Sequence, residues 1–249
     1  MVSLRTIDDW EAPFAAAGVV RADGRVATHG RRDEAVRWAS VTKLLTGLAT
    51  LVAVEEGVVE LDDRLRRLLS HAGERRRTYS NDGIEAAAAL VAVGARMPFD
   101  EYFRDAVVVP LGLQGALQGS PASEYVGPLD DLLALARECL APTLVARETL
   151  DEATTVQFAG LAGVLPGWGR QEPNDWGLTF ELKNGKSPHW MGSLTSPRSF
   201  GHFGQSGTFL WVDPELGAAC GVLTTRDFGG WAKAEWPPFS DAVVRELRE

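Results

Sequence analysis

Lysine and cysteine are scarce in this sequence, and both scarcities constrain its chemistry. Lysine occurs only at positions 43, 183, 186 and 233, while arginine supplies nearly all of the positive charge. A motif that requires lysine therefore arises less readily by chance in this sequence. The two cysteines, Cys139 and Cys220, lie far apart and match no metal-ligand spacing. Two buried thiols are expected rather than a disulfide framework.

Long apolar runs and excess positive charge are also missing. No segment approaches the roughly 18 uncharged apolar residues of a membrane span. Asp8, Asp9 and Glu11 interrupt the region where a secretory signal needs an unbroken apolar stretch. The net charge of −9 argues against binding to nucleic acid or to anionic membranes. We therefore expect a cytoplasmic protein whose partner is a small molecule, not nucleic acid or a membrane.

Signatures of metal and cofactor sites are absent as well. The four histidines are too scattered along the chain to suggest a metal site. There is no P-loop, no dinucleotide fingerprint and no His-Glu-x-x-His motif. The Gly-x-Ser-x-Gly elbow is missing too, because residues 204–207 have the wrong spacing. We expect neither a metal nor a cofactor.

The elements that the sequence predicts alternate in a simple order. Hydrophobic periodicity and turn residues predict helices at 6–17, 40–56, 83–94, 98–107, 129–140 and 239–247, the last capped by Ser240. Residues 61–69 are predicted to form a further helix or a turn. Hairpins are predicted at 19–28 and 208–225, and loops with short strands at 160–199.

A sheet formed from both ends of the chain explains this order. We predict a single domain, residues 1–249, of the α/β (α+β) class. Its antiparallel sheet belongs to residues 1–56 and 161–249 and is flanked by the N- and C-terminal helices. Residues 57–160 are expected to form an inserted helical subdomain on the other face.

Ser40 and Lys43 form the first candidate pair for chemistry. Their i, i+3 spacing places both side chains on one face at the start of a predicted buried helix. Serine is a poor nucleophile without an adjacent base, and a buried lysine can be that base when desolvation lowers its pKa. The alternative is a simple helix cap at Ser40 and a solvated charge at Lys43. Against it, Lys43 adjoins a largely apolar run that extends to Val54.

Two shorter motifs follow. Tyr79 can act as a general base or relay a proton, and Asn81 can bond a substrate carbonyl and the Lys43 ammonium. Alone, these residues indicate only a turn and a helix cap. His202 and Gly204 lie in a strand-like stretch, where glycine marks the close approach of another backbone, for instance that of a substrate. The alternative is a core or edge strand with an incidental histidine.

Taken together, the motifs carry a family resemblance. The stretch from Trp38 to Leu48, continuing to residues 61–63, resembles the nucleophile helix of class C β-lactamases and their esterase and D,D-peptidase relatives. Tyr79-Ser80-Asn81 is similar to the tyrosine motif of that family. Residues 201–204 and 210–217 are similar to its third motif and closing hairpin. The resemblance spans residues 19–226.

This resemblance implies a β-lactamase and transpeptidase-like fold in a compact form, together with roles for individual residues. Ser40 would form an acyl-enzyme, Lys43 and Tyr79 would share the proton transfers, and Asn81 would hold the acyl side chain. His202 and Gly204 would border the acyl pocket. The main-chain N–H groups of Ser40 and Gln205 would form the oxyanion hole, with Gln205 inferred from its position alone.

Two departures from the family pattern bear on function. His202 stands where β-lactamases carry a lysine that holds a carboxylate. Few residues separate 71–73 from Tyr79, where relatives have a long segment, and the charged run 74–77 there is expected to be a solvated loop. We therefore expect a serine hydrolase of esters or amides, closer to esterases or peptidases than to β-lactamases. The open alternatives are acyl transfer to an alcohol or amine and a catalytically silent binding protein.

Overall fold

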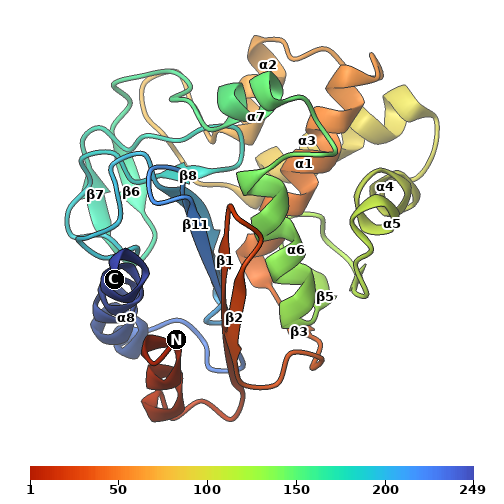
Figure 1. Cartoon of the computed structure of the whole chain (residues 1–249). Coiled ribbons are helices and arrows are strands. Elements are labelled where there is room, and N and C mark those ends of the chain that lie inside the picture. The colour runs from red at the N-terminus through yellow and green to blue at the C-terminus, as the bar shows by residue number, and fades with distance from the viewer.

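One antiparallel sheet organises the protein. The computed structural model describes all residues, 1–249. The sheet has six strands in the order β2-β1-β11-β10-β9-β8, so its N-terminal hairpin pairs directly with the C-terminal strands. Its strands are β1 (Ala15–Arg21), β2 (Val26–His29), β8 (Glu181–Leu182), β9 (Phe200–Phe203), β10 (Phe209–Asp213) and β11 (Ala218–Thr224). Figure 1 shows the sheet between helices on both sides. The predicted fold class is confirmed.

Helix α6 (Leu129–Leu140) covers one face of the sheet, and two glycines allow its close approach. Gly18 of β1 pairs with Gly221 of β11 in the ladder. A Cβ at Gly18 would lie 2.8 Å from a methyl carbon of Leu133, and a Cβ at Gly221 would lie 2.8 Å from a methyl carbon of Leu132. Glycine at this pair of positions therefore lets the helix pack directly onto the two central strands.

The chain ends cover the opposite face. The 3₁₀ helix η1 (Ser3–Asp9) and α8 (Gly230–Arg248) lie together there, as the N and C labels in Figure 1 show. Because successive strand residues point to opposite faces, Phe209 and Trp211 pack toward these terminal helices. Their neighbours Leu210 and Val212 belong to the larger core beneath α6.

The two terminal helices differ from their predicted bounds. A helix predicted at 6–17 ends instead at Asp9, because Pro13 interrupts it and Ala15 already pairs with Thr224 in the sheet. The last helix begins at Gly230 rather than 239, and it continues through Pro237 and Pro238. Ser240 is therefore no cap.

Burial of apolar side chains accounts for the longer final helix. Trp236 and Phe239 are fully buried within it. Ser240 is also buried, and its hydroxyl accepts a hydrogen bond of 3.1 Å from the indole N–H of Trp211. Tertiary packing thus overrides the local signals of the tandem proline and the serine.

The remaining helices lie on the α6 side of the sheet, with α1 (Thr42–Glu55) in their centre. The others are α2 (Asp63–Leu69), α3 (Asn81–Ala95), α4 (Phe99–Phe103), the π-helical η3 (Arg104–Val108), α5 (Val109–Leu111) and α7 (Arg147–Ala153). Two small sheets complete the fold: β3 (Val36–Arg37), β5 (Tyr125–Gly127) and β4 (Ala116–Leu117), and the hairpin β6 (Gly163–Leu165) and β7 (Gly169–Gln171).

None of these helices combines the length and the apolar character that crossing a membrane would require.

Candidate active site

Ser40 is presented by a short strained turn. It lies in the 3₁₀ helix η2 (Ala39–Val41), directly before α1. Ala39 has a φ of 47°, a left-handed conformation that is uncommon for a residue with a side chain. Backbone strain of this kind clusters at functional sites, where the surrounding structure must hold it in place. The turn leaves Ser40 partly exposed, whereas Lys43, one helical turn further, is completely buried.

Two polar side chains converge on the Ser40 hydroxyl. The Lys43 ammonium lies 3.0 Å from Ser40 Oγ, and the Tyr79 hydroxyl lies 2.7 Å from the same atom. Lys43 Nζ also donates to the carbonyl oxygen of Ala122 at 2.8 Å and lies 5.0 Å from the centre of the Tyr79 ring. The structure therefore brings together the three residues that the sequence predicts as catalytic.

Burial sets different protonation states for the two groups beside Ser40. Desolvation lowers the pKa of Lys43 to about 7, while the charge of Glu85 acts in the opposite direction. Near neutral pH a substantial fraction of Lys43 is therefore uncharged and able to accept a proton. Desolvation raises the pKa of the Tyr79 phenol well above its usual value, so this group stays protonated and does not rest as a phenolate.

Gly204 brings the end of β9 against the turn that carries Ser40. A Cβ at position 204 would lie 2.4 Å from the Trp38 carbonyl oxygen. The glycine therefore does mark a close approach of backbone, but the approaching segment is the protein's own η2 turn. The main-chain N–H of the next residue, Gln205, has no partner among the backbone hydrogen bonds of the loops. Gln205 and Ser40 both line the same cavity.

A cavity of about 280 Å³ opens onto Ser40. Its walls include the predicted residues Tyr79, Asn81, His202 and Gln205, so the structure gathers them at one site. Further lining residues come from the β6–β7 hairpin, the loop before β8, β8, β9 and the segment after β11. They are largely apolar: Leu165, Pro166, Gly167, Trp176, Glu181, Phe203 and Phe228.

Asn81 occupies a different position from the one expected. It lies at the start of α3, exposed at the cavity wall, and its side chain makes no hydrogen bond to Lys43. The carbonyl of Ala122 takes that place instead. The Asn81 side chain thus faces the cavity without a bond to Lys43, because the lysine is already held by main chain.

The His202 side chain forms an uncharged part of the cavity wall. Its Nδ1 lies 2.7 Å from the Phe203 carbonyl oxygen, which can only accept, so Nδ1 carries the proton. Its Nε2 is then a bare acceptor, buried and without a partner. Desolvation, reinforced by the charge of Lys43, lowers the pKa of His202 to about 3. The ring packs against Tyr79 and Trp176, with centroids 5.8 and 5.4 Å away.

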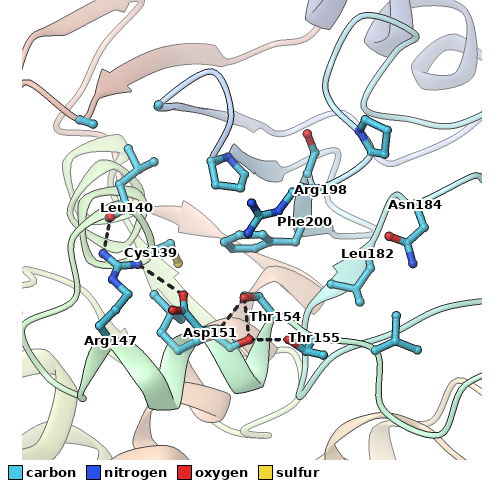
Figure 2. A pocket seen from close by; sticks show the side chains of 17 residues that line it. Cys139, Leu140, Arg147, Asp151, Thr154, Thr155, Leu182, Asn184, Arg198 and Phe200 are labelled. Atoms are coloured by element: carbon cyan, nitrogen blue, oxygen red, sulfur yellow. Dashed lines mark hydrogen bonds and ion pairs between the residues drawn. The ribbon is translucent and has the colours of Figure 1, made fainter.

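A larger cavity, about 570 Å³, lies elsewhere, between α6, α7 and the start of β9. Figure 2 shows that several of its polar groups bind other parts of the protein: Arg147 contacts Leu140 and Asp151, and the hydroxyls of Thr154 and Thr155 turn back to their own helix. Burial raises the pKa of the Cys139 thiol at its wall, which makes this sulfur unreactive. The cavity therefore has no activated nucleophile.

Comparison with known proteins identifies the family of the chain. The sequence matches the profile of the Beta-lactamase family over residues 6–78 and 66–244, which together span nearly the whole chain. The chain belongs to the Beta-lactamase family. A crystal structure of a beta-lactamase from Mycobacterium bovis superposes on this family member with a TM-score of 0.95. It is 44% identical, over 98% of this chain and 99% of that one.

More distant structures share the fold of this Beta-lactamase family protein. Simvastatin synthase from Aspergillus terreus, in a mutant form, has a TM-score of 0.82 and 15% identity over 99% of this chain and 98% of that one. EstCE1, described as a hydrolase with promiscuous acyltransferase activity, has a TM-score of 0.76 and 16% identity over 98% and 96%. No protein with a curated description matches the sequence.

Sequence reasoning missed several residues that shape the site. Ala122 contributes only its carbonyl oxygen, which no side-chain pattern reveals. Glu181 is fully buried at the cavity wall and binds Lys186, His189 and the indole N–H of Trp190. Burial alone would raise the pKa of Glu181, but these cationic and donor neighbours lower it to about 2. Two of the four scarce lysines, Lys183 and Lys186, lie beside it in sequence, and that clustering was the available signal.

Proposed function

We propose that this protein is a serine hydrolase that cleaves uncharged esters or amides through a covalent acyl-Ser40 intermediate. The observation that carries the proposal is the convergence of Lys43 Nζ and Tyr79 Oη on Ser40 Oγ, at 3.0 and 2.7 Å. A nucleophile with a base and a proton donor in contact is the arrangement that acyl transfer needs.

In the first half-reaction Ser40 Oγ attacks the substrate carbonyl carbon. Its proton passes to neutral Lys43 Nζ, whose lowered pKa makes that transfer feasible near pH 7. The negative charge that develops on the carbonyl oxygen is accepted by the main-chain N–H groups of Ser40 and Gln205. The C–O or C–N bond then breaks, and the leaving group takes the phenolic proton of Tyr79. Lys43 replaces that proton, and its own neutral form is regenerated.

In the second half-reaction water attacks the acyl carbon. One water proton passes through Tyr79 to Lys43, and the released Ser40 oxygen recovers a proton from the lysine. Tyr79 thus works as a relay that returns each time to its protonated form, because burial keeps the pKa of its phenol high. A sustained phenolate is not part of the cycle.

The walls of the cavity favour an uncharged acyl group. Trp176, Phe203 and Phe228 offer apolar surface, and His202 is neutral at every pH above about 3. The ionised Glu181 at the wall is paired with Lys186, so no free cation faces the acyl group there. A substrate carboxylate would lose its hydration without gaining a counter-charge.

The test is covalent labelling combined with a substrate panel. A fluorophosphonate should label the wild-type protein on the peptide that contains Ser40, and Ser40→Ala should remove the label while the protein remains folded. The panel compares p-nitrophenyl esters, D-amino-acid amides and a chromogenic cephalosporin. A folded Ser40→Ala variant that keeps full activity would overturn the mechanism. A wild type that neither reacts nor turns over any substrate would favour a silent binding protein.

Acyl transfer is the second candidate function. The apolar cavity favours it, because an alcohol or amine with an apolar body would compete with water there. EstCE1, which shares the fold, is described as having such activity beside hydrolysis. Transfer would be shown by formation of a new ester when an alcohol is added to a p-nitrophenyl ester reaction. Unchanged release of free acid would exclude it.

A further inference from the structure

An exposed carboxylate on α3 is connected to the Ser40 hydroxyl by four hydrogen bonds, two on each side of the Ala122 backbone. Glu85 accepts from the Ser120 hydroxyl at 2.5 Å, and Ser120 Oγ accepts from the main-chain N–H of Ala122 at 3.1 Å. The Ala122 carbonyl accepts from Lys43 at 2.8 Å, and Lys43 contacts Ser40 at 3.0 Å. Every link joins neighbouring groups whose donor and acceptor roles are complementary.

The loop that carries Ala122 is fixed on the other side by α1. Thr46 donates to the Pro121 carbonyl at 2.6 Å, and Thr42 accepts from the Tyr125 N–H at 3.1 Å. Helix α1 thus binds the loop at three places: Thr46 at Pro121, Lys43 at Ala122 and Thr42 at Tyr125. The loop thus spans the space between α1 and α3, and only Glu85 binds Ser120 from the α3 side.

Within the loop, Ser120 is also held by Glu124. The Ser120 N–H donates to Glu124 Oε2 at 2.9 Å, and a Cβ at Gly119 would lie 1.8 Å from that same oxygen. The turn is therefore closed around Ser120, and its hydroxyl is aimed at Glu85. Neither carboxylate lines the cavity at Ser40, so neither can touch the substrate there.

We propose that Glu85 and Ser120 are positioning residues for Lys43: they fix the loop whose Ala122 carbonyl holds the lysine against Ser40. The proposal rests on the function argued above, in which Lys43 is the proton acceptor. It adds a second consequence. Burial lowers the pKa of Lys43, and the charge of Glu85 raises it by favouring the protonated lysine. The balance keeps the pKa of Lys43 close to the working pH, where a base can both take and return a proton.

The other titratable groups around Lys43 do not supply this counter-charge. Tyr79 stays a neutral phenol, because burial raises its pKa. His71 and His202 are buried near Lys43, and desolvation lowers the pKa of each, so both are neutral near pH 7. Glu85 is therefore the one anion among the groups that act on the lysine.

The first experiment reads Lys43 directly and needs no substrate. The chain has only four lysines, so ¹³C-lysine labelling gives a spectrum in which the Lys43 signal is identified by its loss in Lys43→Arg. In Glu85→Gln, which keeps an oxygen for Ser120, the pKa of Lys43 should shift to a lower value. Glu60→Gln is the matched control, because Glu60 is exposed and makes no ion pair. Equal Lys43 pKa values in the two variants would overturn the role of the Glu85 charge.

The second experiment tests the loop with p-nitrophenyl butyrate. Ser120→Ala removes the link to both Glu85 and Ala122 and should lower kcat by roughly tenfold, through misplacement of Lys43. KM should change little, because residues 118–124 do not line the cavity. Ser123→Ala is the control, since the Ser123 hydroxyl makes no hydrogen bond. A kcat in Ser120→Ala equal to that of Ser123→Ala would refute the positioning role.

The two proposals fail separately. If Ser40→Ala keeps its activity, the proposed hydrolase mechanism is wrong, whereas the Lys43 titration still decides whether Glu85 acts on the lysine. If Ser40→Ala is inactive and Glu85→Gln leaves the acid limb of the kcat/KM profile unmoved, the mechanism stands and the role of Glu85 is wrong. If the acid limb shifts to lower pH in Glu85→Gln but not in Glu60→Gln, the result supports both the mechanism and the role of Glu85.

Discussion

Gly204 lies against the amide of Ser40. A Cβ at position 204 would be 3.1 Å from the Ser40 nitrogen and 3.0 Å from the Cβ of Ala39, in addition to its clash with the Trp38 carbonyl. The third motif and the turn that carries Ser40 are therefore parts of one contact, although Gly204 lies 164 positions after Ser40 in the sequence. The close contact between the Ser40 backbone and the residue before Gln205 depends on the absence of a side chain here.

Gly204→Ala should therefore disable the oxyanion hole. The added methyl pushes the β9–β10 turn and the Gln205 N–H away from Ser40, and loss of one such donor costs roughly 10²–10³ in kcat. Gly185→Ala is the matched control, because Gly185 is exposed and a Cβ there meets nothing within 4 Å. Steady-state kinetics and circular dichroism on both variants check the prediction. A folded Gly204→Ala protein with wild-type kcat would contradict it.

Lys43→Arg should be nearly inactive at all pH values. Arginine keeps the positive charge but cannot be deprotonated in a protein, so it cannot accept the Ser40 proton. In the wild type, kcat/KM should rise as pH increases through about 7, the pKa to which burial lowers Lys43. Near-wild-type acylation of Lys43→Arg, followed as the fluorophosphonate labelling rate, would show that the lysine is only an electrostatic partner.

Lys43 should also make the fold less stable below pH 10.5. Its pKa falls from 10.5 to about 7 on folding, so between these values the unfolded chain binds more protons and stability rises with pH. Below about pH 7 Lys43 is protonated in both states, and its destabilising effect on the fold reaches its full size. Lys43→Met removes it but leaves the Ala122 carbonyl without its donor, so we expect a net gain on the order of 1–2 kcal/mol at pH 6 and less at pH 9. Thermal unfolding at both pH values measures this. A variant that is less stable than wild type at pH 6 contradicts the expectation.

The helices with strong periodicity were predictable, and so was the central pair of the site. The run after Lys43 indicated α1, and the predicted helix at 129–140 has the bounds of α6. The spacing of Ser40 and Lys43 was enough to place their side chains together. These features depend on local sequence, because the spacing of apolar residues along a helix determines which face of that helix is buried.

Features that depend on distant packing were not predictable. The start of α8 is set by burial of Trp236 under the sheet, against the local signal of Pro237. Arg77, in a run expected to be solvated, is buried and binds the Gln157 carbonyl at 2.6 Å. The Ala122 carbonyl reaches Lys43 across 79 residues of sequence. Backbone acceptors and buried cations of this kind leave no pattern in the residues near them.

The last prediction concerns the charge of the substrate. His202 lines the cavity at Ser40, and because burial lowers its pKa to about 3, it offers no cation to a carboxylate at any pH where Lys43 can act as a base. Uncharged short-chain p-nitrophenyl esters should therefore be hydrolysed faster than a cephalosporin at equal concentration and pH 7.5. His202→Lys should reduce KM for anionic substrates, since a well-aligned charge-assisted hydrogen bond contributes roughly 1.5–3 kcal/mol.

The control for that variant is His202→Gln, which is polar and uncharged and should leave the preference for neutral esters in place. His202→Lys buries its charge near Lys43, so part of the gain is offset by repulsion and desolvation. For this reason the expected change lies in the ratio of kcat/KM between anionic and neutral substrates, measured for each variant, and not in the absolute rates. Faster turnover of the cephalosporin than of the esters by the wild type, or an equal ratio in His202→Lys and His202→Gln, would show that residue 202 does not set the charge preference.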